Sequence, residues 1–158
     1  MERTLVMDSP IGPLTLQANE NGITRLDFGR TGSPGARGED AAQAHLDMAE
    51  KQLHLYFAGK LKKFDVHLDI RGADFHRKVW EQLLSIPYGQ YLTYGEIAHI
   101  LQRGGAARAV GQACGANPIA IIVPCHRVLA QGGGLGGFGG GLPVKKWLLD
   151  HEGVVYKG

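Results

Sequence analysis

The feature that most constrains the fold of this chain is a change of pattern along its 158 residues. Residues 3–7, 14–18 and 23–28 read as short strands, separated by the Pro- and Gly-containing segment 8–13 and by Asn21-Gly22. Most of the later sequence instead follows helical spacing. This order predicts an antiparallel meander followed by helices, which is an α+β architecture.

The rest of the N-terminal part is predicted to add a helix and one more strand. Residues 40–57 place apolar side chains on one helical face, and residues 64–68 alternate like a strand. We expect an N-terminal domain over residues 1–70, a linker over 71–74 and a C-terminal domain over 75–158.

The C-terminal part is predicted to be mostly helical. Asp74 is placed to cap a helix that ends before the Pro87-Tyr88-Gly89 turn. Thr93 and Glu96 form the pattern of a capping box for a second helix, Tyr94 to Leu101. A further helix over residues 106–116 completes the outline of a helix-turn-helix.

The helix over residues 106–116 carries little side-chain bulk. Two interpretations follow from this property: tight packing against another helix, or close approach of the backbone to a large partner. The small residues are Ala106, Ala107, Ala109, Gly111, Ala113, Gly115 and Ala116.

Composition narrows the class of protein. Hydrophobic residues make up 44% and charged residues 20% of the chain, and no apolar run approaches the length of a membrane span. We expect a cytoplasmic protein without a membrane segment. The seven histidines are scattered and ten residues lie between the two cysteines, so neither a metal site nor a disulfide framework is expected. Residues 1–72 carry a net charge of −1 and residues 73–158 of +3, a small bias that only weakly favours a polyanionic partner.

Cys125 lies in the octapeptide Ile121-Ile122-Val123-Pro124-Cys125-His126-Arg127-Val128. A thiolate is the reactive form of cysteine, and a neighbouring base or positive charge increases its fraction. Pro124 fixes its own φ angle and stiffens the approach to the thiol. On these residues alone, a cysteine that fills the core is an equally good interpretation, because cysteine is among the most buried residue types.

The ordered motifs of the C-terminal part resemble the O6-alkylguanine-DNA alkyltransferase family, also called methylated-DNA–protein-cysteine methyltransferases. The resemblance spans nearly the full length and is densest from Phe75 to Gly153. It implies a ribonuclease-H-like N-terminal domain and a winged helix-turn-helix-like C-terminal domain. The matching segments are Tyr94, residues 106–111, 115–118, 124–128, 139–142 and 151–153, with a less specific match at 8–14.

The resemblance implies direct DNA repair, in which an alkyl group moves once from O6 of a flipped guanine, and from O4 of thymine, to Cys125. In this family pattern His126 takes the thiol proton through a water, and Glu152 holds the imidazole and favours its charged form. Asn117 belongs to the same hydrogen-bond network. Tyr94 donates to N3 of the leaving base. By position alone, Tyr94 is equally an amphipathic residue at a helix start.

The resemblance also implies how DNA is held. Arg108 fills the space that the flipped base vacates, although an exposed arginine on a helix is otherwise a solvated residue. The helix of small residues is implied to lie in the minor groove. The expected partner is double-stranded DNA containing O6-alkylguanine, bound by a nucleoid-associated monomer that can cluster on DNA. The implied DNA-binding residues are Thr93, Tyr94, Ala106, Ala107, Arg108, Ala109 and Gly111.

The implied substrate pocket contains Pro118, Val128, Phe138 and Gly139. Phe138 stands where many family members carry a tyrosine, and Gly139 where some carry a serine. Residues 132–141 include eight glycines, which favours a flexible wall and predicts that O6-ethyl and O6-benzyl groups are accepted. We expect no cofactor, and no structural zinc, because no cysteine precedes Cys114.

Two other functions remain open at the level of sequence. One is a DNA-binding module without catalysis, as in alkyltransferase-like proteins, which replace the reactive cysteine. The other is a cysteine hydrolase that uses Cys125 and His126. If residues 121–126 form a buried strand, as we expect, adjacent side chains point to opposite faces, so these two residues need a bend or a water to act together.

Overall fold

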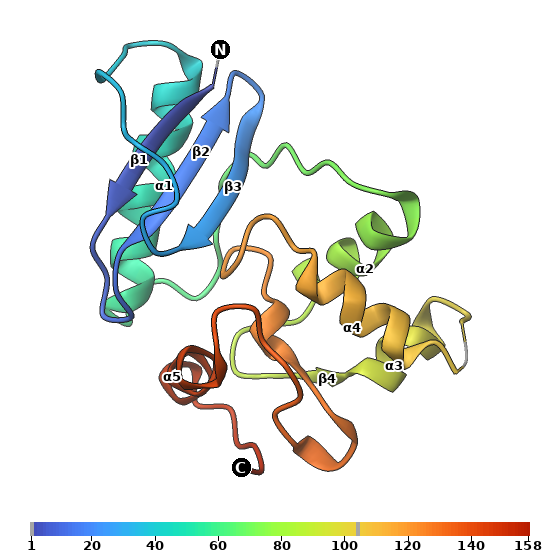
Figure 1. The fold of residues 1–158 in the computed structure, drawn as a ribbon. Helices are drawn as coiled ribbons and strands as arrows, with labels where there is room; N and C mark the ends of the chain where they lie inside the picture. The colour runs from blue at the N-terminus through green and yellow to red at the C-terminus, as the bar shows by residue number, and fades with distance from the viewer. Residues whose placement is uncertain (1, 104) are drawn as a thin grey trace. The chain divides into compact units, whose positions relative to one another are not determined.

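The computed structural model describes residues 2–103 and 105–158, which form two compact units (Figure 1). The first unit comprises Met1–Arg71 together with Pro118–Ala120, and the second comprises Gly72–Asn117 and Ile121–Gly158. Within the described residues, no helix is both long and apolar enough to cross a membrane.

The first unit contains the predicted meander. Strands β1 (Arg3–Met7), β2 (Leu14–Asn19) and β3 (Gly22–Phe28) form an antiparallel sheet in sequence order. Leu16 pairs with Leu5 on one side and with Leu26 on the other, and a bulge at Gln17/Ala18 shifts the register of β2 against β3. The prediction of a three-stranded meander is therefore confirmed.

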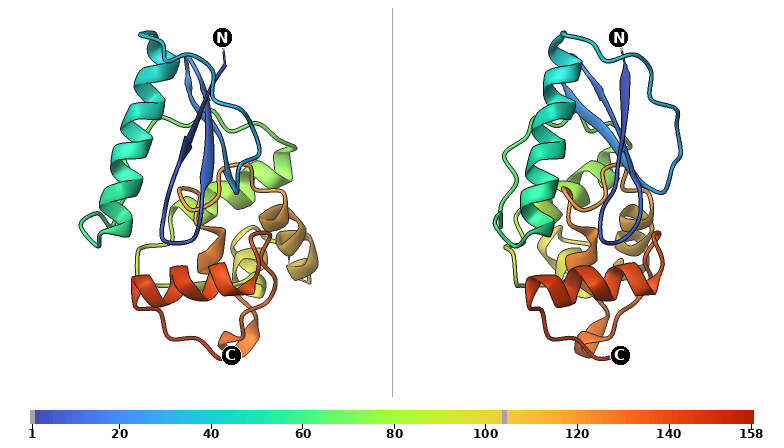
Figure 2. Two further views of the ribbon diagram at one scale, coloured as in Figure 1. Left: turned by 60° about the vertical axis from the view of Figure 1, so that its left-hand side comes forward. Right: turned by 90° about the vertical axis from the view of Figure 1, so that its left-hand side faces the viewer.

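Helix α1 (Ala41–Phe57) packs on one face of this sheet (Figure 2). The side chain of Asp40 accepts a hydrogen bond from the backbone N–H of Gln43, which starts the helix as the sequence predicts. The core between helix and sheet consists of aliphatic side chains and one tyrosine. Its fully buried members include Leu14, Leu16, Ile23, Leu26, Leu46, Leu53 and Tyr56.

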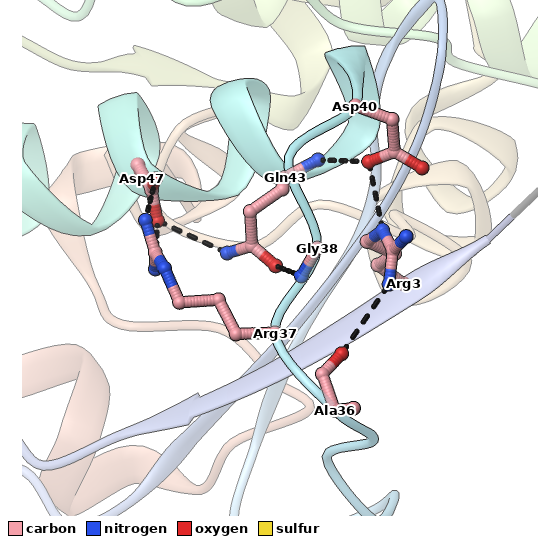
Figure 3. A network of polar contacts seen from close by, with 7 residues as sticks. All are labelled: Arg3, Ala36, Arg37, Gly38, Asp40, Gln43 and Asp47. Carbon is pink, nitrogen blue, oxygen red and sulfur yellow. Dashed lines mark hydrogen bonds and ion pairs between the residues drawn. The ribbon is translucent and has the colours of Figure 1, made fainter.

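The residues just before α1 are fixed by two ion pairs (Figure 3). Arg3 donates to the carboxylate of Asp40 at 2.7 Å, and Arg37 donates to both oxygens of Asp47, at 2.9 and 2.5 Å. Gln43 connects the two pairs because its amide nitrogen donates to Asp47 at 3.0 Å. The loop is therefore held to the first two turns of α1.

The open edge of β3 is covered by two short segments of the same unit. Ile23 donates its backbone N–H to His67 O at 2.8 Å, and Leu26 donates to Pro118 O at 2.9 Å. A Cβ on Gly22 would lie 2.5 Å from His67 O, so this close approach requires glycine. Covering an edge in this way removes unpaired strand groups that would otherwise pair with another chain.

The predicted strand over residues 64–68 is wrong. Only Leu68 pairs, through an isolated bridge with Ile23. The reason is a side chain, because the Gln52 amide donates to Asp65 O at 2.9 Å and accepts from Asp65 N at 2.8 Å. Both backbone groups of Asp65 are thus satisfied without a neighbouring strand.

The second unit is mostly helical. It also contains a small parallel sheet, in which Leu92–Thr93 pairs with Val128–Leu129. Trp80 donates its indole N–H to Ala113 O at 2.8 Å and so ties two helices together. The elements are α2 (Asp74–Leu84), β4 (Leu92–Thr93), α3 (Tyr94–Ile100), α4 (Ala107–Gly115), the 3₁₀ helix η1 (Cys125–Arg127), β5 (Val128–Leu129), the 3₁₀ helix η2 (Gln131–Gly133) and α5 (Leu142–Glu152).

The predicted helix caps and the predicted strand of this unit are only partly confirmed. The Thr93–Glu96 capping box forms in full, with hydrogen bonds of 3.1 and 2.9 Å. Asp74 is not the cap of α2: Ala73 occupies that position without a side-chain bond, and the Asp74 carboxylate lies 3.7 Å from Arg77 instead. The strand expected over residues 121–126 is also wrong, because Ile121 has a φ of +71° and Cys125 begins a 3₁₀ helix.

Candidate active site

Cys125 is the first residue of η1 and is 8% exposed. Its backbone N–H donates to Val123 O at 2.8 Å, which turns the chain sharply at Pro124. The amide of Asn117 donates to the same Val123 oxygen at 2.8 Å and also hydrogen-bonds the Cys125 side chain. The backbone turn and Asn117 together fix the position of the thiol.

His126 points away from the solvent and is completely buried with Glu152. Its Nε2 lies 2.7 Å from Glu152 Oε2. Because this carboxylate is ionised, Nε2 carries the proton of the neutral ring, and Nδ1 is left as an acceptor. Nδ1 forms no hydrogen bond with any described residue. The residue that follows Cys125 therefore carries a basic nitrogen that no described residue hydrogen-bonds.

Arg127 completes a buried charge cluster that we did not predict. Its Nε and Nη2 donate to the two oxygens of Glu152 at 2.7 and 3.0 Å, and Nη1 donates to Ile86 O at 2.7 Å. Such a bidentate pair is both strong and directional. Arg127 thereby neutralises the carboxylate that orients His126.

Lys145 is a second buried cation, and we did not predict its burial. Its Nζ donates to Val128 O at 2.7 Å, to Gly137 O at 3.1 Å and to Leu135 O. The signal was present in the spacing of α5, because Lys145, Leu148, Leu149 and Glu152 recur at the interval of one buried face and all four are buried. Two charges on an apolar stripe indicate a functional or structural polar site.

Burial controls the protonation of this cluster. Burial raises the pKa of Cys125, although the Asn117 hydrogen bond and the charge of Lys145 partly oppose this. Burial lowers the pKa of His126, more than Glu152 raises it. Burial would raise the pKa of Glu152, but hydrogen bonds from His126 and Arg127 lower it to about 2. In the resting site the thiol of Cys125 and the imidazole of His126 are therefore both neutral. Glu152 does favour the charged ring, as expected, but the effect of burial on the pKa of His126 is larger.

A cavity of about 610 Å³ opens beside Cys125. It is lined by residues of α4 and of the glycine-rich segment that carries Phe138 and Gly139. The lining residues are Tyr94, Ala107, Arg108, Gly111, Gln112, Cys114, Gly115, Cys125, Gly137, Phe138 and Gly139. The cavity is large enough for a nucleobase-sized ligand.

Tyr94 lies at the start of α3, where its ring borders this cavity. The hydroxyl donates to Gly137 O at 3.5 Å, and Lys145 Nζ lies 5.8 Å from the ring centre. A Cβ on Gly136, whose φ is +67°, would lie 2.8 Å from the ring. Burial and the nearby cysteines raise the pKa of Tyr94 to about 12, so the phenol remains a hydrogen-bond donor.

The structure does not bring all predicted residues to the cavity. Val128 is buried in β5, and Pro118 belongs to the first unit, where its carbonyl accepts from Leu26. Ala106 is the N-cap of α4, and Thr93 caps α3. The roles assigned to these residues from the resemblance remain predictions.

The geometry defines a class: a buried cysteine followed in the chain by a histidine that a buried carboxylate orients, in a domain with two consecutive helices in contact. Residues 3–70 match the family model for the ribonuclease-like domain of 6-O-methylguanine DNA methyltransferase, and residues 74–154 match the model for its DNA binding domain. The chain belongs to the 6-O-methylguanine DNA methyltransferase family.

Individual relatives agree with this assignment. A methylated-DNA–protein-cysteine methyltransferase of Mycobacterium tuberculosis is 50% identical over 147 residues, which cover 92% of this chain and 89% of the relative. Its namesake in Methanosarcina barkeri is 42% identical over 156 residues, with 93% and 94% covered. The crystal structure of Mycobacterium tuberculosis OGT in complex with DNA is 49% identical, with a TM-score of 0.82 over 96% of this chain and 92% of that chain.

Proposed function

We propose that this protein repairs DNA by moving an alkyl group from O6 of guanine, and from O4 of thymine, onto its own Cys125. The observation that carries the proposal is a buried thiol that lines a base-sized cavity and is followed in the chain by His126, which Glu152 orients and whose Nδ1 has no partner among the described residues. A base next to a nucleophile is the arrangement that covalent catalysis requires.

The reaction begins with a protonated thiol, since burial raises the pKa of Cys125. His126 Nδ1 accepts the thiol proton through a water, and Glu152 stabilises the imidazolium that forms. The sulfur then attacks the alkyl carbon. A carbon–sulfur bond forms while the bond from that carbon to guanine O6 breaks, and the electron pair leaves with the base.

The leaving base gains negative charge, which a donor must stabilise. Tyr94 is suited to this role because its pKa, raised to about 12, keeps the phenol protonated near neutral pH. We assign its hydroxyl to N3 of the flipped guanine, where a hydrogen bond that strengthens with charge lowers the barrier. Asn117 keeps the thiol in line by bonding both Cys125 and Val123 O.

The DNA partner follows from the surface of α4. Ala107 and Gly111 expose little bulk beside the cavity, and Arg108 lies between them in sequence and lines the same cavity. We assign this helix to the minor groove, with Arg108 filling the place of the flipped base. The protein then works as a monomer on double-stranded DNA in the cytoplasm, associated with the nucleoid, and can cluster there.

The product is a thioether on Cys125, and each molecule acts once. A duplex containing one O6-methylguanine, mixed with a twofold excess of protein, tests the proposal by intact-protein mass spectrometry and peptide mapping. We expect one added methylene mass on Cys125 and unmodified guanine in the DNA. The Cys125→Ser variant should bind the duplex and leave the lesion in place.

The same experiment separates the alternatives. Binding without an adduct on Cys125 would indicate a lesion-binding module and overturn the transfer proposal. Repeated turnover of an ester substrate, abolished in Cys125→Ser, would instead indicate a hydrolase. A series of O6-methyl, O6-ethyl and O6-benzyl substrates then tests the predicted tolerance of the glycine-rich wall, which methyl-only reaction would contradict.

A further inference from the structure

The chain that follows α5 is held in a fixed path. Gly153 ends the helix in the left-handed conformation, with a φ of +75°, and the backbone N–H of Val154 donates to Leu149 O at 2.9 Å. The side chain of Val154 is buried. Residues 154–158, which we call the return segment, then lie beside η2 (Figure 2).

The return segment is joined to the beginning of the glycine-rich segment by backbone and side-chain contacts. The backbone N–H of Lys157 donates to Gly133 O at 2.8 Å, and Lys157 also forms an isolated parallel bridge with Gly134. Tyr156 and Leu135 both pack against one buried apolar cluster. Its members are Leu129, Leu149 and Val154.

The residues anchored in this way lead directly into the wall of the cavity. Lys145 Nζ donates to Leu135 O and, at 3.1 Å, to Gly137 O, which gives the same segment a second anchor. Gly137 lines the cavity together with Cys125. Because three residues separate Gly133 from Gly137, a shift at the bond to the return segment reaches the cavity wall within a few residues.

We propose that the return segment positions the glycine-rich wall and thereby determines which O6 substituents react fastest, an inference that rests on the alkyl transfer proposed above. A wall held by two anchors keeps the cavity in one form, which aligns a small methyl group with the sulfur of Cys125. A wall released by the return segment loses this alignment and gains room for a larger group. The residues of the return segment act only through the wall, since none of them is among the described residues that line the cavity.

The bond from Lys157 can be removed without changing the wall itself. Lys157→Pro lacks the backbone N–H that donates to Gly133 O, whereas Lys157→Ala keeps it and serves as the matched control. Single-turnover kinetics compare duplexes that contain O6-methylguanine or O6-benzylguanine. We expect Lys157→Pro to slow methyl transfer about 10-fold and benzyl transfer less, so that the benzyl-to-methyl rate ratio rises. Lys157→Ala should keep both wild-type rates.

A second pair of variants tests the side-chain contact. Tyr156→Ala removes the ring that packs on the apolar cluster, and Tyr156→Phe retains it. We expect the benzyl-to-methyl ratio to rise in Tyr156→Ala and to return to the wild-type value in Tyr156→Phe. This pair also decides the proposal if proline at position 157 prevents folding. Equal slowing of both substrates would show a merely structural role and overturn the proposal.

Hydrogen exchange measures the wall directly, in the absence of DNA. Peptides from residues 130–141 should exchange faster in Lys157→Pro and Tyr156→Ala than in the wild type. Peptides from α2 should exchange at the wild-type rate, which confirms that the variants are folded. Wild-type exchange over residues 130–141 in both variants would contradict the anchoring.

The two proposals fail in different ways. A wild-type protein that transfers no alkyl group would contradict the proposed function, while the exchange experiment would still show whether the return segment holds the wall. Alkyl transfer by the wild type, with Lys157→Pro equal to Lys157→Ala in both rates and in exchange, would overturn only the role of the return segment.

Discussion

Glu152 hydrogen-bonds both His126 and Arg127, so its replacement should have a large effect on stability and on alkyl transfer. Glu152→Gln leaves Arg127 buried without its counter-charge and His126 without its orienting carboxylate. We expect the free energy of unfolding to fall by about 3–5 kcal/mol and alkyl transfer to slow. Urea denaturation and single-turnover kinetics measure both effects.

Asp150→Asn serves as the control, because this residue lies on the same helix and is exposed. It should leave both quantities close to those of the wild type. A Glu152→Gln protein as stable as the Asp150→Asn protein would show that the buried cluster adds nothing to folding.

The pH dependence of transfer follows from His126. Burial lowers its pKa below the ordinary 6.5, so the ring remains a neutral base until the pH falls well under that value. We expect the transfer rate to stay level between pH 7 and pH 6.5 and to fall only at lower pH. Rapid-quench kinetics on a methylated duplex would contradict this if the midpoint of the acid limb lay above 6.5.

At the level of residues, the ordered motifs could predict that His126 and Glu152 lie together, as the structure has them, and they predict Cys125 as the nucleophile. The sequence could not predict that Arg127 and Lys145 are buried. Charged residues are normally exposed, and only the tertiary structure shows the carboxylate and the carbonyl oxygens that accept their hydrogen bonds. For Lys145, the spacing of α5 was the indication that the sequence offered, because it places this residue on the same helical face as Leu148, Leu149 and Glu152.

The start of α3 depends on a reciprocal cap. Thr93→Ala removes the oxygen that accepts from Glu96 N at 3.1 Å, and it should lower stability by about 1 kcal/mol. Thr93→Ser keeps that oxygen and should retain most of the stability. Thermal denaturation of the two variants measures the difference, and equal losses would show that the cap bond is not the cause.

The surface of α4 can be tested with a size series at Gly111. A Cβ there would lie 3.9 Å from the Tyr94 ring, an ordinary contact, so Gly111→Ala should fold. Alanine also favours a helix over glycine by about 1 kcal/mol, so stability should not fall. If this helix enters the minor groove, affinity for duplex DNA should decrease from glycine to alanine to leucine. Fluorescence anisotropy measures it, and equal affinities would contradict that placement.

Elements with a strong local pattern could be predicted from the sequence, and those decided by a distant side chain could not. The meander, α1 and the Thr93 cap follow from spacing and turn residues. The segment 64–68 has the alternation of a strand, yet Gln52 satisfies the backbone of Asp65. That contact spans 13 residues and leaves no trace in the local pattern.

Acid should destabilise the whole molecule in two stages. His126 binds a proton less readily when folded than when unfolded, so stability falls as the pH drops below the unfolded value of 6.5. Glu152 has a folded pKa of about 2 against an ordinary 4.5, and this difference contributes about 3 kcal/mol that is lost as the pH falls from 4.5 toward 2. Urea midpoints at pH 7, 5.5 and 4 measure the trend, and a flat profile would contradict it.

Alkylation should weaken the folded state. The side chain of Cys125 is hydrogen-bonded by Asn117, and an alkyl group on the sulfur should disturb this contact and the packing around it, at a cost of about 1–3 kcal/mol. We expect a lower melting temperature after reaction with O6-benzylguanine. Scanning calorimetry of the alkylated and the untreated protein tests this, and an unchanged transition with a proven adduct on Cys125 would refute it.

The cover on β3 has a consequence for the order of events during synthesis. Pro118–Ala120 complete the first unit, although they are made almost fifty residues after the rest of it ends at Arg71. At the usual pace of about 5–20 residues per second, the ribosome needs several seconds to supply them. During that interval the nascent sheet has part of one edge exposed to other chains. A fragment ending at Arg71 should therefore associate with itself more readily than the full chain.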